Sequence, residues 1–180
     1  MPRRSILTAA EKESLIAIPE NEEDLIRYYT FSEADFSIIR QRRGAANRLG
    51  FAVQLCYLRY PGQFLGPNQT PHPKILEIAA KQLKVSPDVW EAYGQREQTR
   101  REHLLELQAA YQYKLFGINN YQDALNLVTK TALQTDKGIV LAIETVEYLR
   151  KNSVLLPPYN VIERICSEAL TQANRQSILY

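Results

Sequence analysis

The chain has 180 residues, of which 45% are hydrophobic and 23% charged, and its formal net charge is +2. This composition excludes a disordered chain, because enough apolar side chains are present to bury the core of one domain or of two small ones. No long apolar run occurs, so we expect neither a membrane span nor a secretory signal peptide. We therefore expect a globular protein of the cytoplasm.

The first seven residues are expected to form an extended basic arm containing Arg3 and Arg4. Such arms can lie in a DNA minor groove, and a frayed terminus without a partner is the alternative interpretation. Thr8 and Glu11 then have capping-box spacing for a short helix that reaches Ile16. A second short helix is expected to start from an Asn21 cap and to have an acidic first turn, as the helix dipole favours.

The most informative stretch follows this second helix. Between Asp35 and Glu77 lie 41 residues without a single Asp or Glu, and they contain five Arg and Lys74. Their charge is +6, so the rest of the chain carries −4 of the total of +2. Such a concentration of positive charge is typical of a surface that contacts phosphate.

Helical spacing suggests how these side chains are used. Ser32 and Asp35 can cap a helix at its start. Four side chains that suit base edges would then share one helical face: Arg40, Arg43, Asn47 and Gln54. Three more arginines are candidates for phosphate contacts: Arg42, Arg48 and Arg59. The opposite stripe is expected to face the core: Leu49, Ala52, Val53, Cys56 and Tyr60. A solvated basic face on an ordinary core helix is the alternative.

Gly44 leaves two options for this stretch. Either it forms a tight turn between helices at 33–42 and 45–60, or one helix continues through it at a cost of about 1 kcal/mol. The first option would resemble a helix-turn-helix, although the apolar spacing around Gly44 does not match that motif closely. Pro and Gly then cluster, which predicts a linker at 67–73 between helical subdomains at 1–66 and 74–180.

The second half repeats the helical pattern. We expect helices at 74–83, from Ser86 onward, 95–116, 121–133, 137–151 and 158–177. No stretch alternates with period 2 for more than four residues, so the predicted fold is all-α. A second phosphate contact is predicted at Arg96, Arg100, Arg101 and Lys114. Glu97 and Glu102 interrupt this cluster, so salt bridges along the helix are the alternative.

Searches for catalytic chemistry fail. The sequence has no glycine-rich phosphate loop and no HExxH or GxSxG motif. His72 and His103 have no Cys nearby, so we expect no metal site and no cofactor. Cys56 and Cys166 are expected to be reduced thiols in the core. We therefore expect a non-catalytic chain.

Three segments resemble the N-terminal region of the class II (Tn-three type) replicative transposases: MPRRSIL, YYTFSEADFSIIRQRRGAANRLGFAVQLCYLRYPG and LRKNSVLLPPYNVIERICSEAL. The resemblance implies a helical region that binds the terminal inverted repeats of a transposon, with the family's catalytic carboxylates in a later segment. The implied partner is double-stranded DNA at transposon ends, with self-association through the longer parent protein. A helical protein-interaction or dimerisation module without DNA specificity is the alternative.

Overall fold

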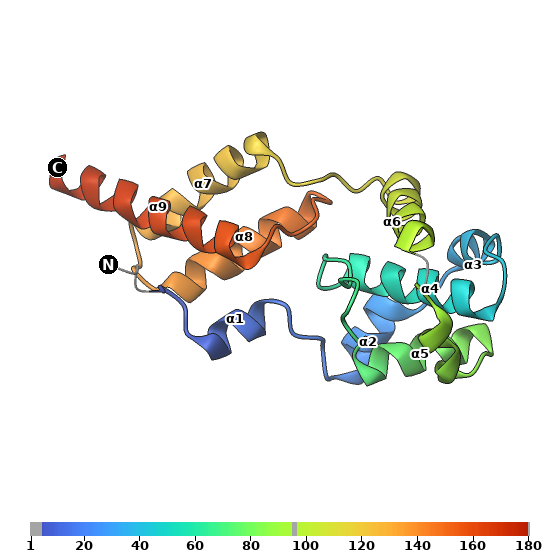
Figure 1. The fold of residues 1–180 in the computed structure, drawn as a ribbon. Helices are drawn as coiled ribbons and strands as arrows, with labels where there is room; N and C mark the ends of the chain where they lie inside the picture. Colours follow the sequence, from blue (N-terminus) through green and yellow to red (C-terminus); the bar gives the residue numbers. More distant parts are fainter. Residues whose placement is uncertain (1–4, 95–96, 180) are drawn as a thin grey trace. The chain divides into compact units, whose positions relative to one another are not determined.

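The computed structural model describes residues 5–94 and 97–179. Its helices are α1 (Ala9–Leu15), α2 (Glu22–Tyr29), α3 (Glu33–Ile39), α4 (Ala45–Arg59), α5 (Pro73–Leu83), a 3₁₀ helix η1 (Pro87–Ala92), α6 (Glu97–Ala110), α7 (Ile118–Ala132), α8 (Gly138–Lys151) and α9 (Tyr159–Leu179) (Figure 1). Within the described ranges the β structure is limited to one isolated bridge, between Lys114 and Val154. The predicted all-α fold is confirmed.

The chain forms two compact units, although not those expected. The middle unit is Ile18–Gln112, and the terminal unit joins Met1–Ala17 to Tyr113–Tyr180. The predicted linker at 67–73 lies inside the middle unit, because α4 and α5 on either side of it pack against each other. Pro and Gly mark an ordered loop here, since the burial of two helix faces outweighs the breaks in local structure.

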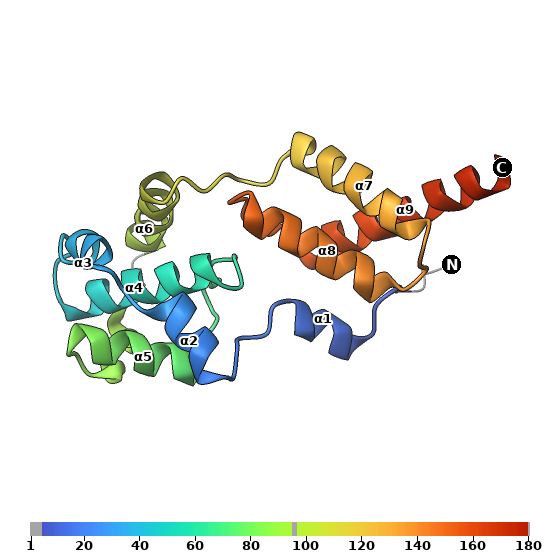
Figure 2. The same cartoon turned by 180° about the vertical axis from the view of Figure 1, so that it is seen from behind.

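Helix α4 is the centre of the middle unit. It contacts α2, α3, α5, η1 and α6, and both views show it flanked by neighbouring helices (Figures 1 and 2). Every residue from Leu49 to Leu58 is buried. A helix that is apolar on all sides belongs inside a fold, and α4 follows this rule. The expected division of α4 into one core stripe and one exposed stripe is therefore wrong over this segment.

Local capping explains where the first helices begin. Thr8 and Glu11 form a capping box at α1, and Ser32 and Asp35 form one at α3. The Asn21 side chain caps α2 by accepting from the backbone N–H of Asp24 at 2.8 Å. Gly44 has a φ of 83°, a conformation that favours glycine, and it precedes α4. The two-helix interpretation of this stretch is thus correct.

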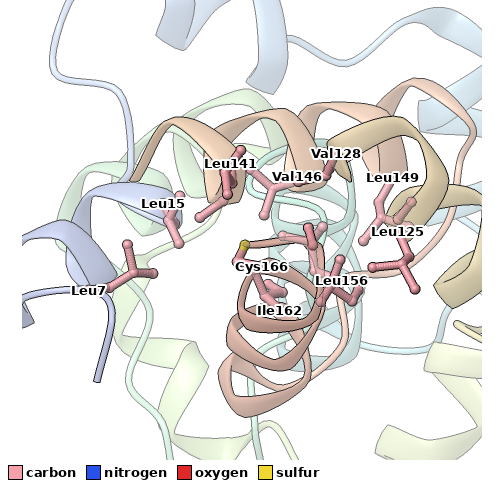
Figure 3. Close-up of a cluster of buried hydrophobic side chains, with 14 of the residues drawn as sticks. Leu7, Leu15, Leu125, Val128, Leu141, Val146, Leu149, Leu156, Ile162 and Cys166 are labelled. Atoms are coloured by element: carbon pink, nitrogen blue, oxygen red, sulfur yellow. The ribbon is translucent and has the colours of Figure 1, made fainter. Parts of the chain in front are cut away.

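The terminal unit has its own core, shown in Figure 3. Helix α7 packs on α9, and both contact α8, which also contacts α1. Leu7 and Leu15 bring the N-terminal segment into this core. Glu163 of α9 fixes the same segment by accepting from Ser5 Oγ at 2.7 Å and from the Ile6 N–H at 3.0 Å.

Three further expectations from the sequence concern the helices after Ser86, the cysteines and a membrane span. The segment after Ser86 is a 3₁₀ helix, and α6 ends at Ala110 instead of continuing to 116; Gln112 just beyond has a φ of 57°. Cys56 and Cys166 are buried and free, as predicted. No helix within the described residues is long and apolar enough to span a membrane.

Candidate nucleic-acid interface

A group of polar and basic side chains lies where α3 ends and α4 begins. We call it the basic surface, and it consists of Arg40, Arg43, Asn47 and Arg48. The three arginines are exposed, and Asn47 is half-buried. Among the described carboxylates, none forms an ion pair with any of these arginines. Their positive charge is therefore open to an external anion.

The first turn of α4 adds to this positive charge. No side chain caps the helix, and its first turn contains no acid. By contrast, α1, α2 and α3 each have a side-chain cap and at least one acid in the first turn. The N-terminus of a helix carries a partial positive charge and free N–H groups, and the first two residues of α4, Ala45 and Ala46, have small side chains. The electrostatics of this turn favour a phosphate.

Hydrogen bonds hold the turn before α4 in place. Asn47 Nδ2 donates to the Arg43 carbonyl oxygen at 3.0 Å, and Arg48 Nε donates to the Arg42 carbonyl oxygen at 2.9 Å. Each bond uses only part of the side chain's capacity. Asn47 keeps its Oδ1 acceptor and a second N–H, and Arg48 keeps its two terminal nitrogens. Both side chains are thus oriented and still able to bind a partner.

Two predicted phosphate contacts have structural partners instead. Arg42 pairs with Glu106 of α6, and its guanidinium lies 4.6 Å from the centre of the Phe51 ring, leaving the side chain 15% exposed. Arg59 Nη2 lies 2.7 Å from both carboxylate oxygens of Asp35. These two arginines hold helices together and are not part of the basic surface.

Gln54 is also misassigned by helical spacing alone. Its side chain is 1% exposed, and it holds the loop after α4. Gln54 Nε2 donates to the Leu65 carbonyl oxygen at 3.3 Å, while Oε1 accepts from the Leu65 N–H at 3.0 Å. The sequence contained a signal for this burial, because the residues on either side of Gln54, FAV and LCYL, are apolar around the whole helix.

The residues of the predicted second phosphate contact belong to different parts of the chain. Arg101 pairs with Glu97 one turn away at 2.8 Å, so the salt-bridge alternative holds there. Arg100 is half-buried in α6. Lys114 is exposed but belongs to the terminal unit. Arg96 lies outside the described residues, as do Arg3 and Arg4 of the expected N-terminal arm.

Other parts of the molecule offer less specific chemistry. A cavity of about 620 Å³ lies between α2 and α5 and combines acids with lysines, lined by Glu20, Glu22, Leu25, Ile26, Thr30, Lys74, Glu77, Ile78, Lys81 and Gln82. In the part of the chain that the structure describes, no group of three or more His, Cys, Asp or Glu could hold a metal ion. The basic surface is therefore our candidate functional site.

Known proteins similar to this chain agree with the resemblance seen in its sequence. The chain is 60% identical over 176 residues to the transposase for transposon Tn3926 of Escherichia coli, and 57% identical over 176 residues to the transposase for transposon Tn21 of the same species. It is 52% identical over 177 residues to the transposase for transposon Tn501 of Pseudomonas aeruginosa. Each match covers 98% of this chain but only 18% of the relative's length.

A family model described as "Domain of unknown function (DUF4158)" matches residues 6–169, which is most of the chain. The predicted similarity to the N-terminal region of class II replicative transposases is confirmed by the relatives named above. The chain therefore belongs to the DUF4158 family.

Proposed function

We propose that this chain binds double-stranded DNA sequence-selectively and serves DNA transposition by docking on the terminal inverted repeats of a transposon. The observation that carries the proposal is the basic surface, in which three exposed arginines without carboxylate partners surround an uncapped helix start. The relatives named above are transposases, which supports a role in transposition. The proposal gives this region recognition of DNA, and it leaves cutting and joining to other segments of a longer protein.

The distribution of charge supports a local DNA contact. The middle unit contains twelve Lys and Arg and also twelve Asp and Glu, so its formal charge is zero. The basic surface therefore results from separation of charge within a neutral unit, and an attraction to DNA should depend on these few side chains. With three arginines on phosphates or base edges, log K should fall against log salt with a slope of about −3.

The side chains of the basic surface suit two tasks. Arg43 and Asn47 can make paired hydrogen bonds, the first to guanine and the second to adenine, in the major groove. Arg40 would supply a third contact to a base edge, and Arg48 would hold a phosphate together with the N–H groups that open α4. In this arrangement α4 enters the groove by its N-terminal turn, as the recognition helix of a helix-turn-helix does.

The test is equilibrium binding, followed by fluorescence anisotropy. Labelled duplexes would carry either a terminal inverted repeat of transposon Tn3926 or a scrambled sequence of the same composition. A slope of about −3 corresponds to a loss of about 40- to 60-fold between 50 and 200 mM salt, with tighter binding to the repeat. A slope near zero would instead favour the alternative, a helical protein-interaction module.

Variants separate the roles of the side chains. Arg43→Ala and Asn47→Ala should each lose about 1 to 3 kcal/mol on the repeat, and much less on scrambled DNA. Arg48→Ala should weaken both duplexes alike. Arg101→Ala is the matched control. It also removes one exposed positive charge from the middle unit, but Arg101 lies outside the basic surface. Equal losses for Arg101→Ala and Arg43→Ala on both duplexes would reject the assignment of this site.

A further inference from the structure

Asp35 is unusual among the acids of this chain. Within the described residues it is the only Asp or Glu that is buried, with 3% of its surface exposed. A buried carboxylate is costly unless charged and polar partners surround it. The partners of a buried carboxylate therefore indicate which elements of the fold it joins.

Asp35 joins three elements of the middle unit. Its carboxylate accepts from the Ser32 N–H at 2.8 Å at the start of α3. It also accepts from Arg59 Nη2 at the end of α4, and from the hydroxyl of Tyr111 just beyond α6, each at 2.7 Å. Burial alone would raise the pKa of Asp35, but the hydrogen bonds from Arg59, Ser32 and Tyr111 and the charge of Arg59 outweigh burial and lower that pKa. The carboxylate is thus ionised at neutral pH.

This network lies at the far end of the two helices from the basic surface. Asp35 is in the first turn of α3 and Arg40 follows its last turn, while Arg59 ends α4 and Asn47 is in its first turn. At 1.5 Å per residue, Asn47 and Arg59 are separated along α4 by roughly 18 Å. Arg59 is therefore well separated from Asn47 along α4, whereas Asp35 lies five residues before Arg40 on α3.

Within the described residues, polar contacts and the chain connection join the two helices at two places. One is the turn at 40–44, and the other is the pair of Asp35 with Arg59. Since α3 has only seven residues, we expect a shift of its first turn to move Arg40, the residue that follows the helix. The spacing between Arg40 and the residues of α4 thus depends on the Asp35–Arg59 pair.

We propose that Asp35 is a positioning residue for DNA recognition: through Arg59 and Tyr111 it fixes α3 against α4, and so sets the spacing of the basic surface. This inference rests on the proposed DNA binding. It also predicts a change in DNA affinity that is opposite to the change expected from net charge alone. Replacing Asp35 by Asn makes the protein more positive by one unit, which favours DNA binding, whereas loss of positioning weakens it.

The experiment compares charge-matched variants on the inverted-repeat and scrambled duplexes. Asp35→Asn should weaken binding to the repeat about tenfold and change binding to scrambled DNA by less than about twofold, since misplaced base contacts cost about 1 to 3 kcal/mol. Glu33→Gln is the control, because Glu33 is an exposed acid of the same helix and its loss adds the same charge. It should leave the preference for the repeat unchanged.

Two further variants keep the test decisive if Asp35→Asn is poorly folded. Tyr111→Phe removes one hydrogen bond without changing charge, and it should weaken binding to the repeat about threefold. The double variant Asp35→Asn with Arg59→Gln replaces the ion pair by a neutral amide pair and should recover part of the lost affinity. That recovery would not occur if Arg59 itself contacted phosphate.

The outcomes separate this inference from the proposed function. If the unchanged protein binds the repeat, but Asp35→Asn and Tyr111→Phe bind it as tightly as Glu33→Gln does, the positioning role is rejected and DNA binding stands. If the unchanged protein shows no preference for the repeat, both proposals are rejected. Unfolding of each variant, followed by the fluorescence of Trp90, confirms that folded proteins are being compared.

Discussion

Replacement of Gly50 by Ala tests the central position of α4, because two arguments predict opposite signs. In a helix seen alone, Ala is more favourable than Gly by about 1 kcal/mol, so the variant should be more stable. In the folded protein, a Cβ atom at Gly50 would lie 2.1 Å from two carbon atoms of the Tyr93 ring. No carbon–carbon contact is that short, so the ring or the helix must move.

The Tyr93 ring has little room to move. It is 8% exposed, its hydroxyl lies 2.9 Å from His103 Nδ1, and its centre lies 5.2 Å from that of the Trp90 ring. Overpacking of this kind costs about 1 to 3 kcal/mol, and loss of the hydrogen bond to His103 would add about 1 kcal/mol. After subtraction of the helix preference, we expect Gly50→Ala to destabilise the middle unit by about 1 to 3 kcal/mol.

The assay is urea and thermal unfolding followed by tryptophan fluorescence. Trp90 is the single Trp of the chain and lies in the middle unit, so its signal reports on that unit. For a unit of this size, the expected loss lowers Tm by about 5 °C or more. In a Tyr93→Ala background the clash is removed, and Gly50→Ala should then be neutral or stabilising. A higher Tm for Gly50→Ala alone, or an equal loss in both backgrounds, would refute this reasoning.

Two further predictions concern buried titratable groups. Burial is the main cause that lowers the pKa of His103 from 6.5 to about 4, and the charge of Arg42 is the second cause. The folded state therefore favours neutral His103. As the pH falls from 7.5 to 5, the middle unit should lose about 2 kcal/mol of its free energy of unfolding. The unfolding midpoint followed by Trp90 fluorescence measures this loss, and His103→Gln should reduce it. If the stability of His103→Gln depends on pH as strongly as that of the unchanged protein, His103 is not the cause of the loss. Burial raises the pKa of Cys56 to about 12 and that of Cys166 to about 11, so iodoacetamide at pH 8 should label both thiols only after unfolding. Mass spectrometry checks this, and rapid labelling of the folded chain would contradict it.

The sequence by itself determined the features of this protein that depend on near neighbours in the chain. Thr8, Asn21 and Ser32 mark the starts of their helices because a cap bonds to a backbone group only three residues away. The all-α class follows from helical spacing in every long segment, and the concentration of arginine around Gly44 is visible without coordinates. These properties can be predicted without knowing which helices pack against each other.

The tertiary structure alone decided which side chains of that stretch can meet a partner. The apolar residues around Gln54 indicate that it is buried, but only the packing of the middle unit supplies its partner, the backbone of Leu65. Arg59 pairs with Asp35, which lies 24 residues earlier, and Asp35 also binds Tyr111, which lies 76 residues later. The same is true of the unit boundary, since the segment before residue 18 packs with helices that begin after residue 112. Contacts between residues so distant in the chain depend on how whole helices pack, which the local spacing of residues does not encode.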